Sequence, residues 1–128
     1  MRDAFHEELD AIQATLVTMG EMVAVAMERS SAALLNADVK LAEQVISEDE
    51  KLDTIQHDLE ARAINLMARQ QPVAQDLRIL VTSLRMSADL ERMGDLCHHI
   101  AKLARMRYPA VAVPPELVST IENMGKTA

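Results

Sequence analysis

The apolar residues of the N-terminal segment recur at alternating steps of three and four from Phe5 to Ala33. The row consists of Phe5, Leu9, Ile12, Leu16, Met19, Val23, Ala26, Ser30 and Ala33, in which Ser30 alone is polar. A stripe sustained over this length is typical of a long helix that packs on other helices. We therefore predict a helix from Asp3 to Leu35, which Gly20 interrupts without ending.

Two more long helices and one short helix are predicted downstream. Asp38 is a good N-cap for a helix from Val39 to Arg69, and Pro72 suits the first turn of a helix that ends at Arg107. A short amphipathic helix is expected from Glu116 onward. Long helices joined by short turns pack antiparallel, so the predicted fold is all-α: an antiparallel three-helix bundle, roughly 45 Å long at about 1.5 Å per residue, with a short fourth helix.

The predicted helices divide the chain into a main unit and a tail. We expect residues 1–107 to form one three-helix unit, residues 108–114 to form a linker in which prolines forbid helix, and residues 115–128 to begin a second unit. The longest uninterrupted apolar run, Met22 to Met27, is too short to cross a bilayer, so no direct membrane insertion is expected.

The net charge limits the binding partners that the protein can have, and the cysteine content indicates the redox compartment. The 128 residues carry a formal net charge of −7, which disfavours binding to nucleic acid and to anionic lipid. Cys97 is the one cysteine and cannot form an internal disulfide, which favours a reducing compartment such as the cytoplasm. No signal peptide is visible at the N-terminus.

The packing stripes of the second and third helices both turn acidic halfway along. The first reads Val39, Ala42, Ile46, Asp49, Asp53, Gln56, Glu60, Ala63 and Met67, and the second reads Leu77, Leu80, Leu84, Ala88, Glu91, Asp95, His98 and Ala101. A solvated face would be polar throughout, and a core seam would be apolar throughout. This pattern predicts a cation held between the two helices.

The register of the hairpin brings the two acidic segments to the same height. Facing residues of an antiparallel pair have numbers that sum to about twice the number at the turn, which lies near residues 70–72. Asp53 should therefore face Glu91, and Asp49 should face Glu91 or Asp95. Asp49 and Asp53 share one helix face, as do Glu91 and Asp95, because each pair is four residues apart.

We therefore predict a metal site made of Asp49, Asp53, Glu91 and Asp95. Carboxylate oxygens suit multivalent ions such as magnesium, calcium, manganese and iron. Nearby side chains that could add further ligands are His98, His99, His57 and Glu60. Histidine nitrogens would shift the preference towards iron or zinc.

Two other interpretations compete with an adaptor that binds metal. In a purely structural bundle, the acidic seam would be hydrated or paired with the nearby cations Arg62, Arg85, Arg92 and Lys102. In a ferritin-like di-metal carboxylate protein, two helices would each carry a Glu-x-x-His motif and two others would each supply a glutamate. Only Asp95-Leu96-Cys97-His98 approximates such a motif here.

Two motifs give the chain a family resemblance. Gln70-Gln71-Pro72-Val73-Ala74-Gln75-Asp76-Leu77-Arg78, followed by Asp89-Leu90-Glu91-Arg92-Met93-Gly94-Asp95, resembles the signature of the PhoU family of phosphate-uptake regulators. The resemblance covers essentially the whole chain. It implies two copies of a three-helix unit, of which this sequence supplies one and the start of the next. It also implies metal clusters held by E/D-x-x-x-D motifs, which match Asp49 with Asp53 and Glu91 with Asp95, and iron, zinc, magnesium or manganese as the metal.

The resemblance further implies a regulatory, non-enzymatic function. Members of the family restrain phosphate import by a phosphate ABC transporter and keep the sensor histidine kinase of the phosphate-starvation response off. They act at the cytoplasmic side of the membrane. A three-helix unit without the rest of its neighbour exposes an apolar stripe, so a homodimer is expected.

Overall fold

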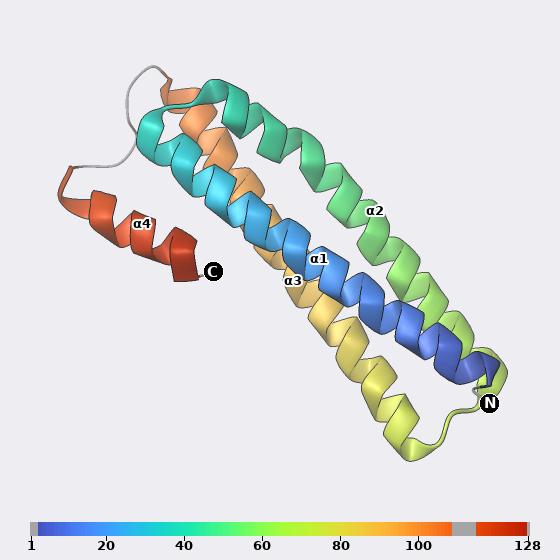
Figure 1. Ribbon diagram of the computed structural model, residues 1–128. Coiled ribbons are helices and arrows are strands. Elements are labelled where there is room, and N and C mark those ends of the chain that lie inside the picture. The colour runs from blue at the N-terminus through green and yellow to red at the C-terminus, as the bar shows by residue number, and fades with distance from the viewer. Residues whose placement is uncertain (1–2, 109–114, 128) are drawn as a thin grey trace.

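Three long helices form the body of the molecule, as the computed structural model of residues 3–108 and 115–127 describes (Figure 1). They are α1 (Ala4–Asn36), α2 (Val39–Gln70) and α3 (Ala74–Arg107). A 3-10 turn, η1 (Pro115–Leu117), leads into the short helix α4 (Val118–Thr127). No strand occurs within these two ranges. The prediction of an all-α, antiparallel three-helix bundle with a short fourth helix is confirmed.

Aspartate caps and left-handed residues set the ends of the first two helices. Asp3 and Asp38 each accept a hydrogen bond from a backbone N–H three residues on, at His6 and Leu41. Ala37 and Gln71 adopt left-handed backbone with φ of 52° and 43°, which turns the chain sharply after each helix. These short turns make α2 antiparallel to its neighbours and leave α1 parallel to α3 (Figure 1).

The third helix starts two residues later than predicted. Pro72 was expected in its first turn, but α3 begins at Ala74, and Val73 is an extended N-cap whose side chain makes no capping hydrogen bond. Proline disfavours helical backbone in the residue before it, and Gln71 is already left-handed, so residues 71–73 complete the reversal before α3 can begin.

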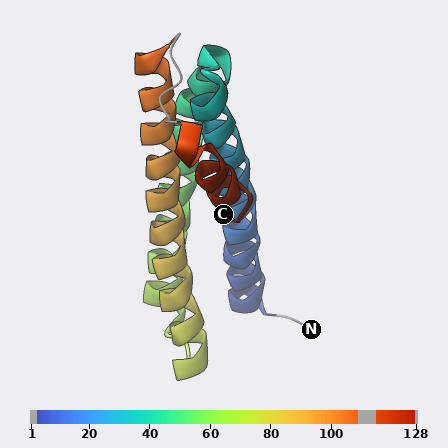
Figure 2. The ribbon, with the colours of Figure 1, turned by 90° about the vertical axis from the view of Figure 1, so that its left-hand side faces the viewer.

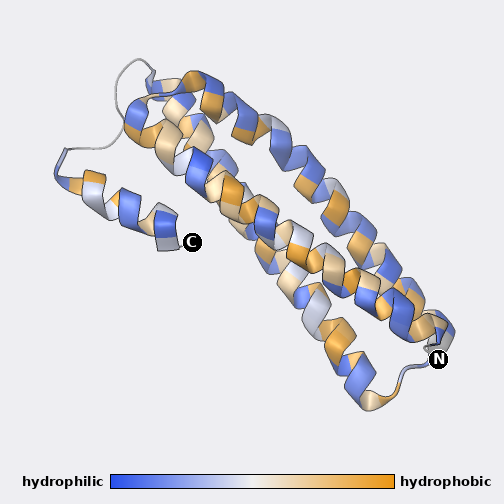
Figure 3. Cartoon of the chain, viewed as in Figure 1, coloured by the Kyte–Doolittle hydropathy of each residue, from blue (hydrophilic) through white to orange (hydrophobic). Residues whose placement is uncertain are grey.

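The core consists of two apolar clusters, one towards each end of the bundle. The larger is built on Phe5, Leu9, Ile12, Leu16, Met19 and Val23 of α1, with Leu52, Leu59, Ala63, Leu66 and Leu80. The smaller contains Ala33, Leu34, Ala42, Val45, Cys97, Ala101 and Ala104. The boundary falls between Val45 and Leu52 on α2 and just before Cys97 on α3, which is where the acidic residues lie. Figure 3 shows hydrophilic and hydrophobic residues alternating along all three long helices.

Helix α4 packs along α1 beside the smaller cluster. Val118 and Ile121 contact that cluster, and a Cβ added at Gly125 would lie 2.8 Å from Ser31 Oγ. Gly125 lies inside α4. Figure 2 shows α4 near the C-terminal halves of α1 and α3, away from their N-terminal halves. The division into residues 1–107 and 115–128 stays a prediction, and most of the expected linker, residues 109–114, lies outside the described residues.

Among the described helices, one is long and apolar enough to cross a membrane when judged by length and composition. This helix is α1, although only Met22–Met27 was considered from the sequence. A single helix of this kind is weak evidence for a membrane span, because core helices of water-soluble proteins meet the same criterion. The larger core cluster buries six apolar side chains from Phe5 to Val23 of α1.

Candidate metal centre

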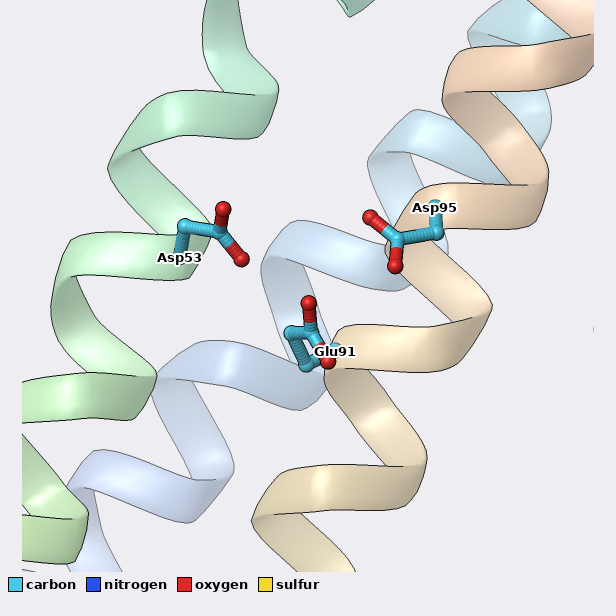
Figure 4. A group of neighbouring side chains, drawn as sticks. All are labelled: Asp53, Glu91 and Asp95. Carbon is cyan, nitrogen blue, oxygen red and sulfur yellow. The ribbon is translucent and has the colours of Figure 1, made fainter.

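Three carboxylates from α2 and α3 converge halfway along the bundle. Asp53 projects from α2, and Glu91 and Asp95 project from successive turns of α3 (Figure 4). One oxygen from each of the three lies within 4.8 Å of the others, and all three side chains are partly buried. The register predicted from the sequence therefore brings three of the four expected acidic residues together.

The spacing of these oxygens suits a single multivalent cation. Oxygen ligands bind magnesium at about 2.0–2.1 Å and calcium at about 2.3–2.6 Å, so two oxygens on one ion lie at most about 4–5 Å apart. The 4.8 Å grouping lies within this limit for calcium, whereas bonds of magnesium length would require the three side chains to move slightly closer together. The donor set is all oxygen, which hard cations such as magnesium and manganese prefer.

The electrostatics of the group favour a positive partner. Burial raises the pKa of Glu91 above its ordinary value of 4.5, and a hydrogen bond with Asp53 and the charge of Asp95 raise it further. A cation would offset the repulsion among the three carboxylates. The arrangement therefore offers three oxygen ligands to a cation, and its carboxylates repel one another when no cation is present.

Asp49, the fourth predicted ligand, is directed to a histidine instead. His98 Nδ1 lies 2.9 Å from Asp49 Oδ2, and the two side chains are 21% and 16% exposed. This pair joins α2 to α3 on the side of the smaller core cluster, next to the three carboxylates. The pairing was not anticipated from the sequence, although Asp49 and His98 both lie on the acidic seams.

The other candidate ligands lie apart from the three carboxylates in this structure. His57 is exposed, and its Nδ1 is 2.8 Å from the backbone oxygen of Asp53. Glu60 is exposed and accepts a hydrogen bond from Gln56 Nε2 at 3.3 Å. His99 is exposed beside His98, with ring centroids 6.2 Å apart. None of the three belongs to the group of converging oxygens.

The lysines and arginines that the structure describes do not neutralise the three carboxylates. Arg62 pairs with Asp58 at 3.8 Å, and Arg92 pairs with Asp89 at 2.9 Å, so both are directed along their own helices. Within residues 3–108 and 115–127, no lysine or arginine forms an ion pair with Asp53, Glu91 or Asp95. The salt-bridge network considered as an alternative is therefore not formed in the described part of the chain.

Gly94 allows α2 and α3 to approach each other beside the site. A Cβ at this position would overlap the Leu52 side chain of α2 and lie 3.6 Å from Asp49 Oδ1. Leu52 is buried in the larger core cluster, so the space that a side chain at position 94 would need is already filled. The glycine thus serves close packing of the helices that carry the carboxylates.

Comparison with known proteins identifies the family. The sequence matches the family described as the PhoU domain over residues 16–104, which include all three converging carboxylates. The chain belongs to the PhoU family. The resemblance seen in the two sequence motifs is thereby confirmed.

Curated relatives of this PhoU chain are named for phosphate transport. The chain is 46% identical over 128 residues to "Phosphate-specific transport system accessory protein PhoU homolog 2" of Mycobacterium tuberculosis. It is 43% identical to PhoU homolog 1 of Mycobacterium leprae and 38% identical to the PhoU homolog of Rhizobium meliloti. All or nearly all of the chain is covered, but it spans only 60%, 58% and 52% of these relatives.

Proposed function

We propose that this chain is a non-enzymatic, metal-binding adaptor of the cytoplasm that restrains phosphate uptake. The observation that carries the proposal is the match of the whole chain to accessory proteins of the phosphate-specific transport system. The family resemblance gives the partners as a phosphate ABC transporter and the sensor histidine kinase of the phosphate-starvation response. A homodimer is part of the proposal.

Regulation is tested in bacteria that lack their own PhoU proteins. We expect expression of the 128-residue chain to lower phosphate uptake and to reduce a starvation-response reporter when phosphate is plentiful. Cells with an empty vector provide the baseline. Uptake and reporter activity that stay at this baseline, with the chain present at normal levels, would show that the chain does not regulate uptake alone.

The metal component of the proposal rests on Asp53, Glu91 and Asp95. These residues would bind an ion of iron, zinc, manganese or magnesium, and the ion would supply positive charge between α2 and α3. Elemental analysis after purification without chelator should find metal with wild type and much less with Asp53→Asn or Glu91→Gln. Glu50→Gln, which changes an exposed carboxylate on α2, is the matched control. Equal metal in all four proteins would contradict the site.

The ferritin-like alternative receives less support. A di-metal site of that type takes carboxylates from four helices. The converging carboxylates come from α2 and α3 alone, and α4 packs along α1. Oxygen consumption on addition of ferrous ion would favour the alternative, and we expect none.

A further inference from the structure

The third helix carries more lysine and arginine than the other two long helices together. All six of these cations are exposed: Arg78, Arg85, Arg92, Lys102, Arg105 and Arg107. Of the four acidic residues of α3, Asp76, Glu91 and Asp95 are partly buried, and Asp89 is exposed. Helices α1 and α2 each carry more acidic than basic residues. The solvent face of α3 is therefore positive in a chain whose formal net charge is −7.

The C-terminal third of α3 (orange in Figure 1) also exposes an apolar stripe. Leu96, Leu103 and Met106 are 58%, 42% and 79% exposed, and His99 between them is exposed as well. These four residues, here called the outer stripe, follow one another at steps of three, four and three. This is the spacing of a stripe that packs on another helix. The outer stripe points away from the bundle, because the buried residues of this segment lie on the opposite side of α3: Cys97, Ala101 and Ala104.

Basic residues flank the outer stripe. On one side, Lys102 directly precedes Leu103, and on the other side, Arg107 directly follows Met106. The sequence from Leu96 to Tyr108 contains no acidic residue. Charges at the positions that flank a helix-packing stripe select a partner helix of opposite charge. The outer stripe therefore matches a helix that has apolar residues at the same spacing and acidic residues beside them.

We infer that the outer stripe binds an acidic amphipathic helix of a partner protein, whose apolar residues pack on Leu96, Leu103 and Met106. The narrow stripe favours a helix over a lipid surface, because helices that lie in a membrane interface present a broad apolar face. The net charge of −7 also disfavours an extended anionic surface. The inference rests on the adaptor role in the proposed function and adds the chemistry of the partner.

Two synthetic peptides of about three heptads test the charge preference. Both carry leucine at the a and d positions, and one carries glutamate and the other lysine at the flanking e and g positions. We expect the 128-residue chain to bind the acidic peptide with a dissociation constant roughly tenfold or more below that for the basic peptide, measured by fluorescence anisotropy. The net charge of the chain would favour the basic peptide, so a preference for the acidic peptide identifies a local basic surface.

Variants locate the binding surface. Lys102→Glu with Arg107→Glu reverses both flanking charges and should exchange the preference, with the acidic peptide bound roughly tenfold or more weakly than by wild type. Leu96→Gln with Leu103→Gln removes apolar surface and should weaken binding of the acidic peptide as well. The matched control makes the same change in charge at exposed positions of α2 and should keep the wild-type preference: Lys51→Glu with Arg62→Glu. Circular dichroism checks that each variant is helical.

Other outcomes would overturn the inference. A wild type that binds neither peptide, or that prefers the basic one, has no acidic-helix site, and an unchanged preference in the Lys102→Glu, Arg107→Glu variant would place binding elsewhere. Vesicles of phosphatidylserine and phosphatidylcholine test the lipid surface, and we expect the wild type not to sediment with them. Vesicle binding that the same variant loses would assign the outer stripe to lipid. Peptide binding is measured apart from regulation in cells, so a chain that binds as expected but leaves phosphate uptake unchanged would contradict the proposed function alone.

Discussion

At the scale of single residues, Glu91 makes the stability of the folded protein depend on pH. Its pKa is raised in the folded protein, so its protonated form is favoured by folding. The resulting stabilisation is fully present below the ordinary pKa of 4.5 and is lost as pH rises through the raised value. The metal-free bundle therefore carries a destabilising charge at neutral pH.

We expect Glu91→Gln to be more stable than wild type at neutral pH when chelator is present. The difference should shrink as the pH falls towards about 4.5, because wild-type Glu91 then becomes neutral as well. The measurement is the midpoint of thermal unfolding of both proteins between about pH 4 and pH 8. A difference that does not change with pH would show that Glu91 is not the group responsible.

The Asp49–His98 pair gives a second prediction at this scale. His98→Ala removes the partner of a mostly buried carboxylate and should lower the free energy of unfolding by about 1 kcal/mol. His99→Ala, on the exposed neighbour, should change it by less than about 0.5 kcal/mol. Urea unfolding of the metal-free proteins measures both values. Equal losses would indicate that the hydrogen bond adds nothing.

The site itself was partly predictable from the sequence. The register of the hairpin placed Asp53, Glu91 and Asp95 together because spacing and turn position fix which helix faces meet. It did not distinguish Asp49 facing Glu91 from Asp49 facing His98, because an estimate of the turn position is good only to about one helical turn. Side-chain rotamers and hydrogen bonds decide among neighbours within that turn.

At the scale of helices, Gly94 and Gly20 differ in the space around them, so replacing each by alanine should have opposite effects on stability. Gly94→Ala would force Leu52 to move within the core and should destabilise the protein by about 1–3 kcal/mol, offset by up to about 1 kcal/mol of helix propensity. Gly20→Ala meets no neighbour and should stabilise by up to about 1 kcal/mol. Chemical denaturation compares the two. If Gly94→Ala proves as stabilising as Gly20→Ala, the close contact with Leu52 is unimportant.

Helix positions could be read from the sequence more reliably than helix ends. The apolar stripe of α1 and the Asp38 cap predicted the first two helices within about one residue at each end, because periodicity and capping are local properties. The start of α3 was missed because the left-handed Gln71 depends on the geometry of the whole reversal. Proline at position 72 is compatible with either start.

At the scale of the whole molecule, α4 packs on the smaller core cluster through Val118 and Ile121 and approaches α1 closely at Gly125. Gly125→Val would press a branched side chain against Ser31 and should release α4 from α1. We expect faster amide hydrogen exchange throughout α4 and unchanged exchange in α2. Asn123→Val, at an exposed position of α4, provides the control. Unchanged exchange in α4 of the Gly125 variant would show that other contacts hold this helix.

The overall bundle followed from the sequence, but the place of α4 did not. Three long stripes joined by short turns permit few arrangements, and the observed one was predicted. The path of a short helix after a proline-containing segment is not limited in this way. Its docking involves Val118, Ile121 and the close approach of Gly125 to Ser31, and no periodic pattern reveals which surface of the bundle these residues meet.

All three converging carboxylates come from α2 and α3, and none comes from α1. An ion bound there would reinforce one side of a triangular cross-section and leave the two sides that involve α1 at their original strength. The contact between α2 and α3 would then be stronger than the contacts that either helix makes with α1, and α1 would be the helix most readily displaced.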